Sequence, residues 1–392
     1  MRNSTFKLGD ITEVITKGTT PTSVGFKFVE SGINFVKVES ITADGLFLTS
    51  KFASISDECN KTLKRSQLQE GDVLFSIAGA LGRTVLVPKS ILPANTNQAL
   101  AIIRLKSDIA IDKRFLLLAL QTSVTMEQVE KYRGGVAQQN LSLGQLKNFE
   151  IPDIPISNQK RIVAIIDQAF ADIEQTRAKT EQNLKNTREL FLSEKQQMFS
   201  DLEAESEIFP LNSVCNGIFA GGDAPGKGLF SKHKTEKFTI PIFANAVKDN
   251  GLYGFTDFSR VQEPSITIAA RGSGTGHIEL RTDPFLPIVR LIVLTPNENI
   301  LLLEYFKLAL QNLDILRSGS AIPQLTVPMI KGYSIPIPAI PKQLNIVAEL
   351  KKLEVLIDEL NENYKNKLQQ LDELKKSILQ KAFAGELSKS NA

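Results

Sequence analysis

The sequence predicts an α+β protein in which two globular segments alternate with two long helices. Three observations support this: the chain repeats itself at a fixed offset, the repeated part has helical periodicity, and the remainder contains short β-rich runs. The predicted segments are a globule at 1–157, a helix at 158–205, a second globule at 206–341, and a helix with a C-terminal tail at 342–392. If the helices pair antiparallel as a coiled coil, the repeat becomes a pseudo-two-fold axis.

The internal repeat covers both long helices and the segment that enters each of them. IPDIPISNQKRIV, starting at Ile151, returns 184 positions later as IPIPAIPKQLNIV, starting at Ile335, and the register continues without a gap to Phe383. Before each globule the offset differs, because Phe6 matches Phe209, 203 positions later. The chain therefore alternates variable and constant segments, and two copies are too few for a solenoid.

Each repeated segment has the periodicity of a long amphipathic helix. Apolar positions recur at spacings of three or four, and Lys and Glu occupy the other faces. A narrow stripe on a helix of about 40 residues, ~60 Å long, is typical of a coiled-coil seam. The prolines before each segment fix where the helix begins. The predicted stripe comprises Ile162, Ile165, Ala169, Ile173, Thr176, Thr180, Leu184, Thr187, Phe191 and Met198, and in the second helix Leu353, Ile357, Leu360, Tyr364, Leu368, Leu371, Leu374 and Ile378.

The two variable segments read as α+β globules. The first contains FASIS, DVLFSIA, GRTVLVP and ALAIIRL, which are β-rich runs separated by Gly, Pro and Asn, and then a helix from about Lys113 to Tyr132. The second contains FTIPIFA, SITIAA, HIELR and LIVLT, followed by a helix from about Leu301 to Arg317. Both globules are therefore expected to place their helix after the sheet.

Composition excludes several classes of protein. The 46 Lys and Arg against 43 Asp and Glu give a net charge of only +3, so a DNA-binding hypothesis must rest on where the charges lie. The two cysteines form no C-x-x-C motif, and the two histidines have no partner at metal-ligand spacing. No apolar run reaches the ~18 residues of a membrane span. We expect a cytoplasmic protein with reduced thiols.

The loops of the globules carry residues suited to nucleic acid. The first globule offers TKGTTPT, GALGR and ANTNQ, and the second offers AGGDAPGKG, SKHK and RGSGTGH. Glycine lets the backbone approach phosphate, hydroxyls donate to it, and Arg, Lys, Asn and Gln read base edges. The same loops are also typical of ordinary β-hairpin turns, so both interpretations stay open. The candidates chosen on residue chemistry are Thr19, Thr20, Arg83, Asn97, Gln98, Lys227, Lys234, Arg271, Ser273 and Arg281.

Enzymatic motifs are not convincing. GSGTG at 272–276 is followed by HIEL, which reads as a strand, whereas a phosphate-binding glycine loop opens a helix. GALGR lacks the Gly-Lys-Ser/Thr of a P-loop, and the sequence contains neither G-x-S-x-G nor His-Glu-x-x-His. We therefore predict no catalytic residue, no metal site and no cofactor in this chain.

Over essentially its whole length the chain resembles the DNA specificity subunit of type I restriction-modification enzymes. The matching stretches are QQNLSLGQLKNFEIPDIPISNQKRIV, PQLTVPMIKGYSIPIPAIPKQLNIV and LQKAFAGELS. The resemblance implies two target recognition domains, each reading one half of a bipartite asymmetric site in double-stranded DNA. It also implies that the antiparallel helices set the gap and bind two adenine methyltransferase subunits, joined by endonuclease/translocase subunits. S-adenosylmethionine, ATP and Mg²⁺ would belong to those partners.

The resemblance also supplies site residues. It adds Gln138, Gln139 and Gln324 as DNA-binding candidates, and Gln159, Arg161, Gln343, Phe199 and Phe383 as contacts to partner subunits. Asn158 and Lys342 stand where the family usually has an acidic residue.

The residues alone leave two alternatives open. One is a coiled-coil scaffold that spaces two protein-binding β domains and never touches DNA; salt-dependent binding to a duplex distinguishes it. The other is a stand-alone enzyme acting through the glycine loops, which would bind a nucleotide or S-adenosylmethionine.

Overall fold

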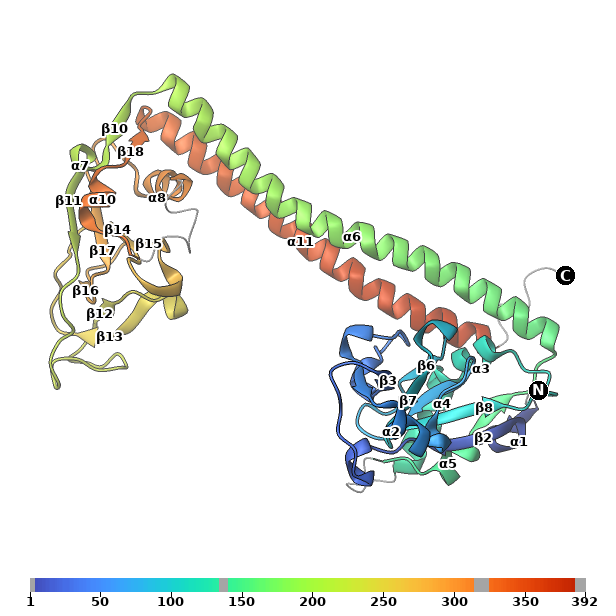
Figure 1. The fold of residues 1–392 in the computed structure, drawn as a ribbon. Coiled ribbons are helices and arrows are strands. Elements are labelled where there is room, and N and C mark those ends of the chain that lie inside the picture. Colours follow the sequence, from blue (N-terminus) through green and yellow to red (C-terminus); the bar gives the residue numbers. More distant parts are fainter. Residues whose placement is uncertain (1–3, 134–139, 314–323, 385–392) are drawn as a thin grey trace. The chain divides into compact units, whose positions relative to one another are not determined.

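The computed structural model describes residues 4–133, 140–313 and 324–384. By internal contacts the chain divides into unit 1, which comprises Met1–Lys179 and Lys367–Ala392, and unit 2, which comprises Thr180–Asn366. Two long helices, α6 (Ile156–Glu205) and α11 (Ile340–Phe383), contribute residues to both units (Figure 1). The predicted α+β class with two long helices is confirmed. Gln138 and Gln139 lie outside the described residues.

Unit 1 contains two sheets, ordered β2-β8-β5-β6 and β4-β3-β7, and the two-stranded pair β1-β9. The four predicted strand regions are found as β4, β5, β6 and β8. Its elements are β1 (Thr5–Lys7), α1 (Leu8–Ile11), β2 (Thr12–Lys17), β3 (Ile33–Val36), β4 (Ala53–Ile55), α2 (Asp57–Thr62), β5 (Val73–Ser76), β6 (Thr84–Leu86), β7 (Ala94–Thr96), β8 (Leu100–Leu105), α3 (Lys113–Leu120), α4 (Ser123–Arg133), α5 (Leu143–Lys147) and β9 (Glu150–Pro152).

Unit 2 repeats this topology, with sheets ordered β11-β17-β14-β15 and β13-β12-β16 and the pair β10-β18. The β3-β7 and β12-β16 pairings are parallel. The elements of unit 2 are β10 (Ile208–Pro210), α7 (Leu211–Val214), β11 (Cys215–Ala220), β12 (Ile240–Phe243), β13 (Leu252–Thr256), β14 (Ser265–Ile268), β15 (Ile278–Arg281), β16 (Leu286–Pro287), β17 (Ile292–Pro296), α8 (Leu303–Asn312), α10 (Val327–Lys331) and β18 (Ser334–Pro336).

The strand pair that precedes each long helix matches both sequence offsets. Phe6 of β1 lies opposite Ile151 of β9, and Phe209 of β10 lies opposite Ile335 of β18. The first members are 203 positions apart and the second members 184. The duplication therefore extends through the variable segments, where the sequence shows it only weakly.

The helix expected from Lys113 to Tyr132 is two helices, so that prediction is wrong in detail. Thr122 ends α3 and begins α4: its hydroxyl donates to the Ala119 carbonyl (2.7 Å) and accepts from the Thr125 N–H (3.3 Å). A threonine that caps in this way starts a new helix. In unit 2, α8 ends at Asn312, and residues 314–317 of the predicted helix lie outside the described residues.

Within each unit the long helices run antiparallel. In unit 1 Arg177 pairs with Asp372 and Glu174 with Lys375, so numbers rise along α6 as they fall along α11. In unit 2 the Thr187 hydroxyl donates to Asn361 Oδ1 at 2.6 Å. These three contacts define the antiparallel pairing of the helices.

The buried face of the long helices differs in places from the predicted stripe. Ile166 is buried, whereas Ile165 is 36% exposed. Leu360 and Leu374 are 40% and 45% exposed, so their assignment to the seam is wrong. Spacing alone did not identify these three positions, because steps of three and four allow a drift around the helix.

Among the described residues, no helix combines the length and apolar character needed to cross a membrane.

Candidate nucleic-acid interface

Three loops of unit 1 meet at one edge of the β2-β8-β5-β6 sheet. They follow β2, follow β5 and precede β8. The N–H of Ile77 donates to the Ala99 carbonyl (2.9 Å), and the N–H of Gly18 donates to the Leu100 carbonyl (3.4 Å). The N–H of Thr19 donates to the Thr96 carbonyl (3.2 Å). We call residues 18–20, 77–83 and 97–99 the unit 1 loop edge.

Five predicted DNA-binding residues lie at the unit 1 loop edge, and four of them are in the loops after β2 and before β8. The hydroxyl of Thr20 donates to Oε1 of Gln98, whose side chain is exposed. The side chain of Asn97 accepts a hydrogen bond from the N–H of Ala99 (3.2 Å), and Thr19 lies beside Thr20. The structure thus brings together residues about 80 positions apart, as strand pairing requires and sequence order does not show.

Unit 2 builds the same edge from residues 221–222, 270–277 and 288–291, the unit 2 loop edge. The N–H of Gly221 donates to the Leu291 carbonyl at 2.8 Å, as that of Gly18 does to Leu100 in unit 1. A Cβ at Gly221 would lie 2.7 Å from the Pro287 carbonyl oxygen, and one at Gly18 would overlap the Thr96 carbonyl. Only glycine fits this close backbone approach.

A glycine hairpin rises at each loop edge. Gly79 and Gly82 have φ of 74° and 81°, and Gly272 and Gly276 have φ of 79° and 87°. These left-handed conformations favour glycine, and they account for GALGR and RGSGTGH. The backbone N–H groups of Leu141 and Leu325 donate to Ile77 and Ala270, each at 2.8 Å, and so fix a further segment beside each hairpin.

Arg83, a candidate for reading bases, is engaged inside unit 1. Its Nη1 donates to the carbonyl oxygens of Ile41 (2.8 Å) and, more weakly, Val38 (3.5 Å). The guanidinium therefore holds the loop after β3 in place. Both bonds use Nη1, and the side chain is half-buried.

Arg281 is likewise internal. Its side chain is only 9% exposed, its Nε donates to the Thr267 hydroxyl (3.2 Å) and its Nη2 to the Asn250 carbonyl (2.5 Å). The guanidinium lies 3.6 Å from the centre of the Phe243 ring. Burial lowers its pKa to about 10, which still leaves it charged at neutral pH. In this structure the Arg281 side chain links β15 to Thr267 and Asn250 and is buried.

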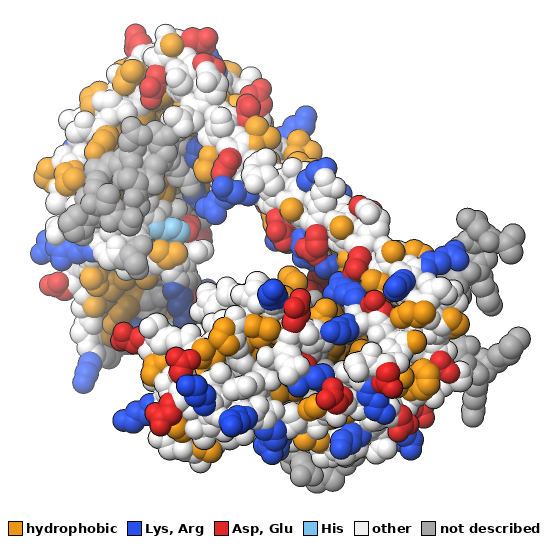
Figure 2. All heavy atoms as spheres, turned by 45° about the vertical axis from the view of Figure 1, so that its right-hand side comes forward, with side chains coloured by type: hydrophobic (Ala, Val, Ile, Leu, Met, Phe, Trp, Pro, Cys, Tyr) orange, Lys and Arg blue, Asp and Glu red, His pale blue; other side chains and the backbone are white. Residues whose placement is uncertain are grey.

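The remaining DNA-binding candidates are solvent-facing or undescribed. Lys227 and Lys234 are exposed on the connection between β11 and β12. Arg271 and Gln324 are exposed, and a β-bridge joins their backbones at the unit 2 loop edge. Ser273 lies in the hairpin, but its side chain is not described. Figure 2 shows Lys and Arg side chains interspersed with Asp and Glu over the face in view, which fits the small net charge.

Sequence reasoning missed Arg290, which is exposed at the unit 2 loop edge. It lies in FLPIVRLIVLT, where surrounding apolar residues favour a continuous strand. No local motif marks it. Only the backbone conformation distinguishes this position, with φ of 60° at a residue that is not glycine.

Gln159 and Gln343, expected to bind partner subunits, are buried within the chain, at 1% and 0% exposure. Oε1 of Gln159 accepts from the Asp112 N–H (2.8 Å), and its Nε2 donates to the carbonyls of Ala110 (3.1 Å) and Ile154 (2.7 Å). Each glutamine thus fastens the start of a long helix to its own globule. Their side chains are not accessible to a partner in this structure.

Gln343 makes the same three bonds in unit 2. Its Oε1 accepts from the Leu302 N–H (2.9 Å), and its Nε2 donates to the carbonyls of Ile300 and Pro338, both at 2.8 Å. Repetition of so specific a set shows that the helix entry is duplicated along with its surroundings.

The aromatic candidates Phe199 and Phe383 also pack internally. Phe199 is buried, with its ring centre 6.0 Å from that of Tyr305 on α8. Phe383 is half-buried, with its ring centre 5.1 Å from that of Phe115 on α3. Each therefore fixes the end of a long helix to a globule. Arg161 alone among the five partner candidates is exposed.

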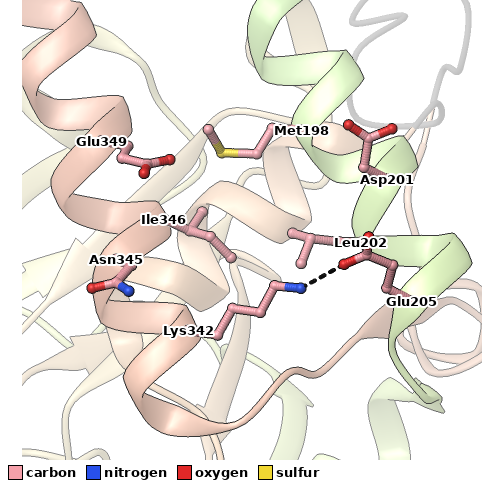
Figure 3. A pocket seen from close by; sticks show the side chains of 8 residues that line it. All are labelled: Met198, Asp201, Leu202, Glu205, Lys342, Asn345, Ile346 and Glu349. Atoms are coloured by element: carbon pink, nitrogen blue, oxygen red, sulfur yellow. Dashed lines mark hydrogen bonds and ion pairs between the residues drawn. The ribbon is translucent and has the colours of Figure 1, made fainter.

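A hollow in unit 2 lies between the end of α6 and the start of α11 (Figure 3). Lys342 and Glu205 cross it, with 2.8 Å between Nζ and Oε2, and this pairing lowers the pKa of Glu205. Met198, Leu202 and Ile346 line its apolar part. Lys342 thus pairs within the chain.

Comparisons with known proteins agree with the duplicated fold. A family model described as "Type I restriction modification DNA specificity domain" matches residues 2–185 and 203–370. A putative type I specificity subunit of Mycoplasma pneumoniae is 35% identical over 40% of this chain and 46% of its own length. The specificity subunit of the type I restriction enzyme EcoBI of Escherichia coli is 32% identical over 36% of this chain and 30% of its own. The matched stretches thus span less than half of each of these two relatives.

Two solved structures share the fold. One, titled for complex assembly and conformational transition of the type I restriction-modification system, has a TM-score of 0.72 at 19% identity and covers 98% of both chains. The other, described as the HsdS subunit of Thermoanaerobacter tengcongensis, has a TM-score of 0.66 at 18% identity and covers 97% of this chain and 96% of its own. Since the family model matches both halves of a chain whose two halves share one topology, the chain belongs to the type I restriction-modification DNA specificity family.

Proposed function

We propose that this chain is a non-catalytic specificity subunit that reads a bipartite asymmetric site in double-stranded DNA. The segments 1–157 and 206–341 act as target recognition domains, and each reads one half of the site through its loop edge. The exposed candidates Gln98, Lys227, Lys234, Arg271 and Gln324 supply contacts. Family membership supports the assignment to a type I system.

The observation that carries this proposal is one loop edge built twice with different side chains. The same sheet order recurs in both units, and the bond from the Gly18 N–H to the Leu100 carbonyl matches that from the Gly221 N–H to the Leu291 carbonyl. At corresponding positions the side chains differ: Gln98 and Ala99 precede β8, whereas Val289 and Arg290 precede β17. A shared frame with different side chains is what recognition of two unlike half-sites requires, because base edges are read by individual side chains.

The long helices are proposed to bind two adenine methyltransferase subunits, with endonuclease/translocase subunits completing the complex. Leu190 and Leu374 support a protein contact, because they are 50% and 45% exposed at positions 184 apart in the repeat. Arg161 is the exposed candidate beside the helix entry. S-adenosylmethionine, ATP and Mg²⁺ belong to the partner subunits in this proposal, and the complex acts in the cytoplasm.

Salt-dependent duplex binding tests the proposal against a protein-only scaffold. The chain, assembled with the methyltransferase subunit of its source strain, is expected to retain a random-sequence duplex library and to enrich one bipartite motif. The logarithm of affinity should fall linearly with that of salt concentration, by about 0.9 per phosphate contacted. Failure to retain any duplex at about 50 mM salt would favour the scaffold instead.

A further inference from the structure

Arg290 occupies a strained turn at the unit 2 loop edge. It follows Val289 between β16 and β17, and the N–H of Leu291 donates to the Ile288 carbonyl (3.1 Å), closing a two-residue turn. Val289 and Arg290 have φ of 52° and 60°. Turns with two positive φ values favour Asn-Gly, and a β-branched residue there is unfavourable.

The strained turn is anchored from several sides. The side chain of Asn245 accepts from the Ala270 N–H at 2.8 Å through Oδ1, while its Nδ2 donates to the Val289 carbonyl. The N–H of Val289 donates to the Gly222 carbonyl at 2.7 Å. These bonds tie the turn to the base of the glycine hairpin and to the loop after β11. Arg290 therefore projects from a fixed backbone.

Unit 1 closes the corresponding turn with a bond from the N–H of Leu100 to the Asn97 carbonyl (3.3 Å), but its two central residues, Gln98 and Ala99, do not have positive φ. Ile77 and Ala99 continue the β5-β8 pairing, with 2.9 Å from the N of Ile77 to the O of Ala99. By the β14-β17 register, Ala270 and Arg290 are the corresponding residues. In unit 2, however, the N–H of Ala270 donates to the side chain of Asn245. Unit 2 thus has a hydrogen bond to the Asn245 side chain where unit 1 has a backbone bond between two strands. Arg290 lies at the position whose counterpart in unit 1, Ala99, accepts that backbone bond.

We infer that Arg290 reads a guanine in the half-site recognised by unit 2, an inference that rests on the proposed function. A phosphate contact carries no sequence information, whereas a base-edge contact reads sequence and depends on where the side chain enters the groove. Arginine pairs in bidentate fashion with O6 and N7 of guanine in the major groove. Backbone strain persists where surrounding bonds enforce it, and it concentrates at functional sites.

Two substitutions of Arg290 test the inference in the assembled complex, by sequencing duplexes selected from a random library. Arg290→Gly preserves a turn with positive φ and is expected to lower discrimination at one guanine position by roughly 5- to 150-fold. The other half-site should be selected as strongly as before. Arg290→Lys should restore less than the full discrimination, because lysine lacks the bidentate fork.

Lys331→Gln is the control for loss of a positive charge, because Lys331 is exposed on α10 and is not one of the loop-edge residues. It is expected to keep the selected motif unchanged. Equal weakening of all sequences by Arg290→Gly, with a salt slope smaller by about 1, would make Arg290 a phosphate contact and overturn the inference. An unchanged motif for Arg290→Gly would also overturn it. If the wild-type complex selected no motif, the proposed function itself would fail.

Discussion

Removal of one heptad from each long helix is expected to shorten the nonspecific gap of the DNA site by about three base pairs. Residues 181–187 of α6 and 361–367 of α11 are suitable, because Thr187 and Asn361 are paired across the helices. Seven residues correspond to ~10 Å of helix, and one base-pair step to ~3.4 Å. Selection from a random duplex library, with the variant assembled with its methyltransferase subunits, measures the gap.

Two further variants control the heptad deletion. Insertion of a heptad in both helices at the same place should lengthen the gap by about three base pairs. Deletion from one helix only should weaken the pairing and destabilise the chain, since the facing residues lose register. A gap that stays the same in both symmetric variants would refute the role of the helices in spacing the half-sites.

Replacement of Gln159 or Gln343 by leucine is expected to lower the free energy of unfolding by about 3 kcal/mol or more. Each buried amide satisfies three backbone groups, and each buried polar group left without a partner costs about 1–3 kcal/mol. Chemical denaturation followed by circular dichroism measures the loss.

Gln168→Leu provides the control for the glutamine substitutions, because Gln168 is exposed on α6 and its Nε2 donates to Asp172 one turn away. Its effect should stay within about 0.5 kcal/mol. If Gln159→Leu and Gln343→Leu left stability unchanged but abolished methyltransferase binding, the internal role would be wrong and the original expectation of a partner contact would be restored.

The helices and the repeat could be predicted because their signals are local and long. A gapless offset from Ile151 to Phe199 leaves little freedom of alignment, and the 3.6-residue period recurs over many turns. The stripe was less predictable: Leu360 and Leu374 satisfy the spacing yet remain exposed. Whether an apolar residue of one helix is buried depends on where the other helix lies, and the spacing of apolar residues along one helix does not give that position.

The loop edges were only partly predictable from residue chemistry. An arginine can bind a base edge, donate to backbone carbonyls or stack on an aromatic ring equally well. The sequence therefore could not distinguish Arg83 and Arg281, which make internal contacts, from an exposed arginine such as Arg271. The glutamines at the helix entries were assigned to partner contacts by the resemblance, and an amide can bond equally well to a partner or to its own backbone. Arg290 was not predicted because the sequence around it does not indicate its positive φ.

Methylation mapping after exchange of one globule tests the central claim most directly. The chain and its methyltransferase subunits are produced in a host lacking adenine methylation, and long-read sequencing locates N6-methyladenine. The wild-type chain should give one bipartite motif with a fixed gap. Exchange of residues 206–332 for the corresponding domain of another specificity subunit should change one half of that motif and leave the other intact. A change in both halves, or a contiguous motif, would contradict the assignment of one globule to each half-site.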